Sequence, residues 1–167
     1  MAEYGQQAEI GAVGIRLLFP DKRIQHQGVI MGIQARASHA FAGCLSNDAS
    51  ARGQLQAARN FSAVTAACMF TRRSVFLEMG GYDTEKFKIA YNDVDYCMRL
   101  WSQGYRVVCT PHSALIHYET SSRPNKDIPE EVAQLQDTYL SDPKWRDPFY
   151  HPYLRQDFPN FVPDKIS

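Results

Sequence analysis

Asp93 and Asp95 are the residues whose type and spacing best suit chemistry. Two carboxylates at the start of a helix could remove a proton from a hydroxyl or hold a divalent cation. Asn92 is a good N-cap residue and Gly104 stands where a left-handed C-cap is expected, so the stretch between them predicts a helix. Spacing alone favours helix stability as the reason for both carboxylates. The helix dipole stabilises negative charge in the first turn, which also makes each carboxylate a weaker proton acceptor.

Apolar residues follow the carboxylates at helical spacing. Val94, Cys97, Met98 and Trp101 recur every three or four positions, so they fall on one face of the expected helix. That face is expected to pack on a core. The acidic first turn is then expected at the mouth of a site.

Three other features could carry chemistry. The small residues Thr65, Ala66 and Ala67 would let another molecule approach the backbone, although close strand packing would select the same residues. His117 closes an apolar run and could ligate a metal or contact a phosphate, but a single histidine more often makes ordinary hydrogen bonds. Cys68 has no evident histidine and acid partners, so we do not assign it as a nucleophile. Neither glycine-rich phosphate-loop pattern occurs.

Composition limits the class of protein. The 167 residues suit one domain, and 44% hydrophobic with 22% charged residues is ordinary for a globular chain. Eighteen basic and eighteen acidic residues cancel, which argues against a nucleic-acid partner. The four cysteines form no C-x-x-C pair, which favours free thiols in a reducing cytoplasm. No stretch approaches the roughly 20 apolar residues of a membrane-spanning helix, and the N-terminus does not read as an export signal.

The remaining pattern predicts an α/β chain. Strands are expected at 10–19, 24–32, 68–72, 105–110 and 114–118, the first two joined as a hairpin and the last two separated by Pro111. Residues 33–60 are expected to form a long loop with a helical turn near 55–59. Short helices are expected at 75–79, capped by Ser74 and stopped by glycines, and from 129 to about 141. Residues 121–124 mark a linker, and the proline-rich, aromatic tail is expected to be irregular but ordered.

Six short motifs follow one another in a fixed order along the chain: Ala12–Asp21, Gln25–Val29, Val64–Met69, Arg72–Phe76, Gly80–Asp83 and Asn92–Cys97. Together they resemble the C-terminal half of family 2 glycosyltransferases. The similarity covers residues 9–124 and extends into the tail at 147–150, where the chain is similar to bacterial members that build O-antigen and other surface polysaccharides.

This resemblance implies the C-terminal half of a GT-A fold, a Rossmann-like mixed sheet with flanking helices. Residues 1–124 would form the acceptor side of the catalytic domain, and residues 125–167 a C-terminal helix and a wrapping tail. The nucleotide-sugar half, with its Asp-x-Asp motif, is expected upstream, so the chain is expected to be truncated and inactive by itself. The implied location is the cytoplasm, including the inner face of the cell membrane.

The resemblance also implies site residues. Asp93 would be the general base of an inverting transfer of a hexosyl or deoxyhexosyl group from a nucleotide-sugar to a glycan or lipid-linked acceptor. A divalent ion, Mg²⁺ or Mn²⁺, would serve the full-length enzyme, with His117 as a ligand. The substrate would be bound by Thr65, Ala66, Ala67, Tyr91, Asn92 and Asp95, with Asp95 as a helper residue or a helix cap.

Two other classes of function stay open. One is a non-catalytic domain that binds glycan or protein, suggested by the aromatic tail. The other is a metal-dependent hydrolase built on Asp93, Asp95 and His117.

Overall fold

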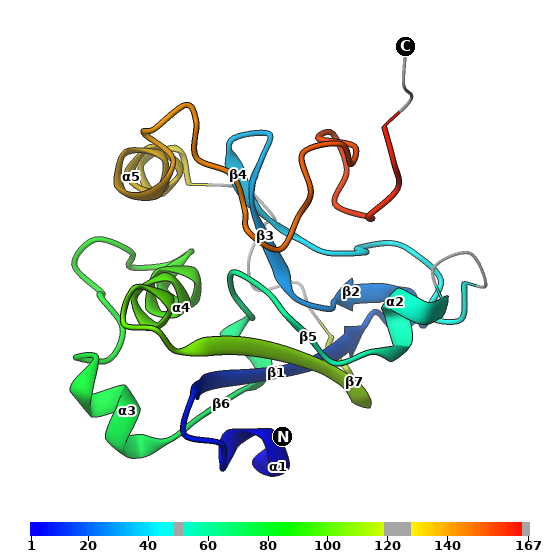
Figure 1. The fold of residues 1–167 in the computed structure, drawn as a ribbon, viewed down its shortest axis with the longest axis horizontal. Coiled ribbons are helices and arrows are strands. Elements are labelled where there is room, and N and C mark those ends of the chain that lie inside the picture. Colours follow the sequence, from blue (N-terminus) through cyan, green and yellow to red (C-terminus); the bar gives the residue numbers. More distant parts are fainter. Residues whose placement is uncertain (49–51, 119–127, 165–167) are drawn as a thin grey trace.

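The computed structural model describes residues 1–48, 52–118 and 128–164. Its main sheet is built around β1 (Ile10–Leu18), in the order β2-β1-β7-β5, with β6 also paired to β1. β7 (Arg106–Ile116) runs parallel to β1, and the other pairs are antiparallel (Figure 1). These other strands are β2 (Ile24–His26), β5 (Arg59–Asn60) and β6 (Met69–Thr71). The fold is therefore mixed α/β, as predicted.

β1 is almost wholly buried, which explains its nearly continuous apolar sequence. The predicted hairpin is confirmed at its first half, where β2 pairs with the end of β1. The expected second strand, 24–32, is divided at Gly28, whose φ is +99°. A Cβ at this position would lie 2.3 Å from the ring of Phe61. The chain turns here and enters a second sheet.

This second sheet pairs β3 (Val29–Ile33) with β4 (Arg36–His39). The prediction of a long loop over 33–60 is therefore wrong for β4, and also for β5. The turn between β3 and β4 places Gln34 and Ala35 at positive φ, a geometry usually signalled by asparagine or glycine. The short helix α2 (Arg52–Gln56) begins three residues before the predicted helical turn.

The prediction of two strands on either side of Pro111 is also wrong. β7 is continuous, and a register shift opposite Ile15 and Arg16 absorbs residues 111–113. Proline has no N–H to give to a ladder, so an irregularity at this point lets the strand continue.

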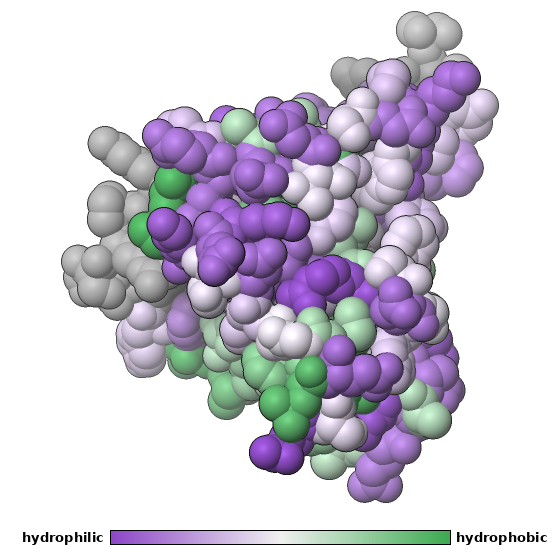
Figure 2. All heavy atoms as spheres, turned by 90° about the vertical axis from the view of Figure 1, so that its left-hand side faces the viewer, coloured by the Kyte–Doolittle hydropathy of each residue, from purple (hydrophilic) through white to green (hydrophobic). Residues whose placement is uncertain are grey.

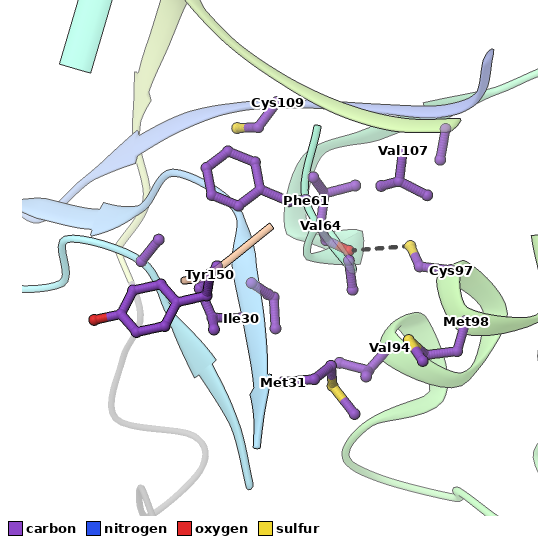
Figure 3. Close-up of a cluster of buried hydrophobic side chains, with 14 of the residues drawn as sticks. Ile30, Met31, Phe61, Val64, Val94, Cys97, Met98, Val107, Cys109 and Tyr150 are labelled. Carbon is purple, nitrogen blue, oxygen red and sulfur yellow. Dashed lines mark hydrogen bonds between the residues drawn. The ribbon is translucent and has the colours of Figure 1, made fainter. Parts of the chain in front are cut away.

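The main core lies between the sheet, the β3–β4 hairpin and the helices. Figure 3 shows Val94 and Cys97 of α4 facing Val64, Val107 and the other buried side chains. A smaller apolar cluster contains Ile10, Val13 and Val108, covered by residues of α1 (Ala2–Gly5) and β6. The remaining helices are η1 (Ala66–Cys68), α3 (Arg73–Glu78), α4 (Asn92–Ser102) and α5 (Pro129–Tyr139).

The helix starts differ from prediction. The N-cap of α4 is Tyr91, with φ 61°, so Asn92 is already the first helical residue. The N-cap of α3 is Arg72 rather than Ser74, and no side chain caps it. The helix stops were predicted correctly, since Gly80, Gly81 and Gly104 all have positive φ.

The buried face of α4 was only partly predicted. Val94, Cys97 and Met98 are buried as expected, but Trp101 is 40% exposed. Leu100 takes its place and packs on β1, where a Cβ at Gly11 would lie 2.7 Å from it. The helix is therefore rotated toward Leu100 relative to the predicted stripe.

The C-terminal tail is irregular and packed, as expected. Phe161 is buried and stacks on Phe41 with ring centroids 5.0 Å apart. The ring of Tyr150 packs edge-on against that of Phe161, with centroids 4.9 Å apart. Asp147 is also buried, and its Oδ2 accepts hydrogen bonds from the Met31 N–H and the Ser62 hydroxyl. The predicted linker and the boundary at 124/125 lie outside the described residues.

Candidate functional site

The structure brings the small-residue loop against the start of α4. The N–H of Ala66 donates a 2.8 Å hydrogen bond to Oδ2 of Asp93. Thr65 caps the short η1 turn, because its hydroxyl accepts from the Ala67 N–H at 3.3 Å. The Cys97 thiol donates to the Val64 carbonyl at 3.8 Å, the contact dashed in Figure 3. The small-residue loop and the first turn of α4, which are 27 positions apart in the sequence, therefore meet at Asp93.

Asp93 is partly exposed at the N-terminus of α4. Its Oδ1 accepts from the N–H of Val94 at 2.8 Å, one of the donors that a helix start leaves without an intrahelical partner. Each carboxylate oxygen thus accepts one backbone hydrogen bond and keeps a further lone pair. The arrangement fixes the direction of the carboxylate and leaves it able to accept a hydrogen bond from a bound hydroxyl.

Asp95 is in a different environment, with 2% of its surface exposed. Its Oδ2 forms an ion pair with Nε of Arg99 at 2.9 Å, and its Oδ1 accepts from the Tyr139 hydroxyl at 2.6 Å. Arg99 also donates to the carbonyls of Met79 and Gly81, which end α3. Asp95 therefore ties α4 to α3 and α5, which agrees with a structural role for this carboxylate.

The phenol of Tyr139 stays a hydrogen-bond donor near neutral pH. Burial raises the pKa of Tyr139, and its hydrogen bond to Asp95 raises it further. The sequence did not indicate this partner, because Tyr139 lies 44 residues beyond Asp95. Tyr139 falls within the last helix, which was predicted from 129 to about 141, but the helix prediction carried no information about its hydrogen-bond partner.

A second residue that the sequence did not indicate is Glu131, whose carboxylate lies in the first turn of α5. It is 7% exposed and accepts hydrogen bonds from three successive backbone N–H groups, at residues 88, 89 and 90. These residues lead directly into Tyr91 and α4. An acidic residue at a helix start is ordinarily explained by the dipole, so no pattern in the sequence distinguished it.

His117 lies at the end of β7, and its Nδ1 donates to Oε1 of Gln25 at 2.8 Å. Gln25 is 6% exposed and also donates to the His117 carbonyl at 3.4 Å. With Nδ1 protonated, Nε2 carries the lone pair that a metal would need. Across residues 1–48, 52–118 and 128–164, no three His, Cys, Asp or Glu side chains gather as a metal site. The metal assignment of His117 stays a prediction.

A pair of histidines, His26 and His39, supports the small-residue loop through a hydrogen bond from the Thr65 N–H to His26. His26 is 1% exposed, and its Nε2 accepts from the N–H groups of Gly28 at 3.3 Å and Thr65 at 3.4 Å. This leaves the proton on Nδ1, which faces Nδ1 of His39 at 2.8 Å. Burial, and then the nearby His39, lowers the pKa of His26 well below its usual value. The ring is therefore neutral, as its acceptor role requires.

The face that carries α3, α4 and α5 is largely polar, with separate apolar areas (Figure 2). All four cysteines are free, as predicted. Burial raises the pKa of the Cys97 thiol, and it raises the pKa of Cys109 to about 12. In the part of the chain that the structure describes, no helix has the length and apolar character to cross a bilayer.

Several known bacterial proteins are similar in sequence to this chain. The chain is 40% identical over 159 residues to the O-antigen biosynthesis protein RfbC of Myxococcus xanthus, covering 92% of this chain and 12% of that protein. It is 34% identical over 168 residues to the uncharacterized protein y4gI of Sinorhizobium fredii, covering 97% and 18%. A third similarity, 29% over 77 residues, covers 46% of this chain and 25% of an N-acetylglucosaminyl-diphospho-decaprenol L-rhamnosyltransferase of Mycobacterium tuberculosis.

These similarities point to a glycosyltransferase-like family. No protein-family model matches the chain. The chain spans less than a fifth of the length of the first two relatives. The resemblance inferred from the motifs is confirmed at this coarse level, whereas family 2 membership, the GT-A fold and the individual site residues stay predictions.

Proposed function

We propose that this chain forms the acceptor side of an inverting, nucleotide-sugar-dependent glycosyltransferase, with Asp93 as the general base. The observation that carries the proposal is the contrast between the two carboxylates of α4. Asp93 is partly exposed and held by backbone N–H groups beside a loop of small residues, whereas Asp95 is buried and paired. The O-antigen and rhamnosyltransferase names of the relatives support the same class of reaction.

In the proposed reaction an acceptor hydroxyl lies against Asp93. The acceptor oxygen forms a bond to the anomeric carbon of the donor sugar, while the bond from that carbon to the diphosphate oxygen breaks. The hydroxyl proton passes to Asp93 and then to solvent, and the nucleoside diphosphate leaves with the electron pair. The attack from the opposite side inverts the anomeric configuration. The Ala66 N–H keeps the carboxylate pointed in one direction during proton transfer.

The acceptor surface is proposed to include Thr65, Ala66, Ala67, Tyr91 and Asn92. Alanine side chains in the loop leave room for a sugar ring near the backbone, and Asn92 brings an amide next to the base. Asp95 is proposed to contribute by fixing α4 rather than by touching the acceptor.

A divalent ion is proposed for the full-length enzyme, where it would stabilise charge on the leaving diphosphate. His117 would be one ligand, because its hydrogen bond to Gln25 leaves Nε2 available. The other ligands are proposed to come from the nucleotide-sugar half of the full-length enzyme. The enzyme is proposed to act in the cytoplasm, including the inner face of the cell membrane.

The test compares Asp93→Asn with the parent in the longer protein that contains this segment. Purified protein is given UDP- and dTDP-sugars with Mn²⁺ or Mg²⁺ and acceptor oligosaccharides, and release of nucleoside diphosphate and of the glycosylated product is measured. We expect a loss of about a hundredfold or more in kcat for Asp93→Asn. Asp137→Asn, an exposed position on α5, is the matched control and is expected to keep full activity.

Wild-type transfer by Asp93→Asn would refute the base assignment. Release of sugar that needs no acceptor would favour the hydrolase instead. Calorimetry of the 167-residue chain alone addresses the donor half. Micromolar binding of a nucleotide-sugar by this chain would contradict the proposal that the donor site lies elsewhere, and binding of oligosaccharide without any transfer by the longer protein would favour the glycan-binding domain.

A further inference from the structure

The turn that leads into α4 is held by a carboxylate from another helix. Oε1 of Glu131 accepts from the N–H groups of Lys88 and Ile89 at 3.1 and 3.0 Å, and its Oε2 accepts from Ala90 at 2.6 Å. Successive N–H groups that converge in this way form an anion-binding nest. Here a side chain of the protein itself fills the nest.

This turn determines where Asp93 lies. Tyr91 follows the nest directly and adopts a left-handed conformation, with φ 61°. A non-glycine residue holds this conformation only when its surroundings over-determine it. The Asp95 N–H then donates to the Tyr91 carbonyl at 2.8 Å and starts the helix. A shift of the nest would therefore move the first turn of α4, including Asp93.

α5, which carries Glu131, also contacts α4 at Asp95, just after Asp93 in the sequence. The Tyr139 hydroxyl, two turns along α5, donates to Asp95 at 2.6 Å. α5 itself is anchored, since Leu135 is fully buried and the Gln136 amide donates to the Ala35 carbonyl at 3.0 Å. Figure 1 shows α5 beside α4 and the β3–β4 hairpin.

We propose that α5 acts as a brace for the Asp93 turn, with Glu131 as a positioning residue for the transfer reaction. This inference rests on the proposed function, because it takes Asp93 as the base. Glu131 touches no substrate in this scheme and acts through the backbone of residues 88–91. The brace requires a side chain at position 131 that only accepts hydrogen bonds, because three backbone N–H donors converge on it.

Glu131→Gln fails to meet this requirement, although it changes the size of the side chain very little. Whichever way the amide is oriented, its NH₂ group faces at least one backbone N–H, so a donor meets a donor. Glu131→Asp keeps the charge but shortens the reach by one methylene. Glu130→Gln is the matched control, because Glu130 is adjacent, exposed and outside the nest. Ile10→Val is the stability control, since it removes one methylene in the smaller apolar cluster.

The experiment uses the longer protein that contains this segment and makes two measurements on each variant. Amide hydrogen exchange of residues 88–90 reports the brace whether or not sugar is transferred. We expect exchange about tenfold faster or more in Glu131→Gln and unchanged in Glu130→Gln. Steady-state kinetics report positioning. We expect kcat to fall roughly ten- to a hundredfold in Glu131→Gln, with the KM for the nucleotide-sugar within about twofold, and Glu131→Asp to be intermediate.

Each outcome decides a separate point. Unchanged exchange at residues 88–90 in Glu131→Gln overturns the brace. Faster exchange with an unchanged kcat overturns the positioning role, and so does an equal loss of kcat in Ile10→Val when the two variants are equally stable. Full activity of Asp93→Asn refutes the proposed function itself, a result that the exchange measurement cannot produce or mask.

Discussion

Replacing Asp95 with alanine tests the assignment of the two carboxylates most directly. The substitution removes an ion pair to Arg99 at 2.9 Å and the 2.6 Å hydrogen bond from Tyr139, at a side chain that is 3% exposed. Arg99 keeps its hydrogen bonds to the carbonyls of Met79 and Gly81, but the Tyr139 hydroxyl loses its acceptor. The cost therefore comes mainly from partners that remain unpaired.

The magnitude follows from the exposure of the two ions. Removing one partner of a fully buried ion pair costs about 3–5 kcal/mol. The Arg99 side chain is 27% exposed, so solvent takes up part of the loss and we expect about 2–3 kcal/mol of unfolding free energy. In a chain of this size that corresponds to roughly 4–12 °C in Tm. Asp93→Ala removes two backbone hydrogen bonds from a half-exposed carboxylate and is expected to cost only about 1 kcal/mol.

Urea denaturation of the 167-residue chain measures these differences, and a double-mutant cycle with Tyr139→Phe isolates the hydrogen bond. We expect a coupling energy of about 1–2 kcal/mol between positions 95 and 139. If the proposed full-length enzyme is assayed at a temperature where all variants are folded, we expect Asp93→Ala to reduce transfer more than Asp95→Ala does. A change in stability below about 0.5 kcal/mol for Asp95→Ala would refute the structural role of this carboxylate.

Two further predictions concern the support of the small-residue loop. Burial lowers the pKa of His26 well below its usual value, so below about pH 6.5 the unfolded chain binds a proton that the folded chain does not. The free energy of unfolding should therefore fall as the pH is lowered from that point, by up to about 1.4 kcal/mol per pH unit. Urea midpoints measured at about pH 7.5 and 5.5 should show a smaller drop in His26→Gln than in the parent chain. An equal drop in the two proteins would contradict the assignment of this pH dependence to His26. Gly28→Ala should cost about 2–4 kcal/mol, because its φ is +99° and the new Cβ would lie 2.3 Å from Phe61. Gly43→Ala is the control, since its φ is +78° but no heavy atom lies within 4 Å, and equal losses in the two variants would show that the clash is not the cause.

Much of the fold follows from local pattern. The apolar run of β1, the glycines after α3 and α4 and the range of α5 agree with the predictions from the sequence. The second sheet could not be predicted in the same way. β4 carries no large apolar residue, and its turn uses Gln34 and Ala35 at positive φ, which sequence rules do not favour. α5 and the tail both contact the hairpin, since the Gln136 amide donates to the Ala35 carbonyl and Asp147 accepts from the Met31 N–H.

The candidate site shows the same division. The acidic start of α4 and the small-residue loop were both visible as motifs, but only the folded chain brings the Ala66 N–H to 2.8 Å from Asp93. Glu131 and Tyr139 could not be found by spacing, since their partners lie more than 40 residues away. Long-range hydrogen bonds leave no periodic trace in a sequence. Their residues look like any helix start or helix stripe.

Helix geometry explains why two neighbouring carboxylates differ so strongly. Residues two apart on an α-helix are separated by about 200° around its axis, so they cannot serve one face. When Asp95 turns inward to Arg99 and Tyr139, Asp93 must turn outward toward the small-residue loop. A metal shared by these two carboxylates would need both on one side, and the described residues gather no such group with His117. The helix therefore gives the two carboxylates different environments, which the sequence pattern did not distinguish. Asp95 is a buried structural residue, and Asp93 is a carboxylate at the surface.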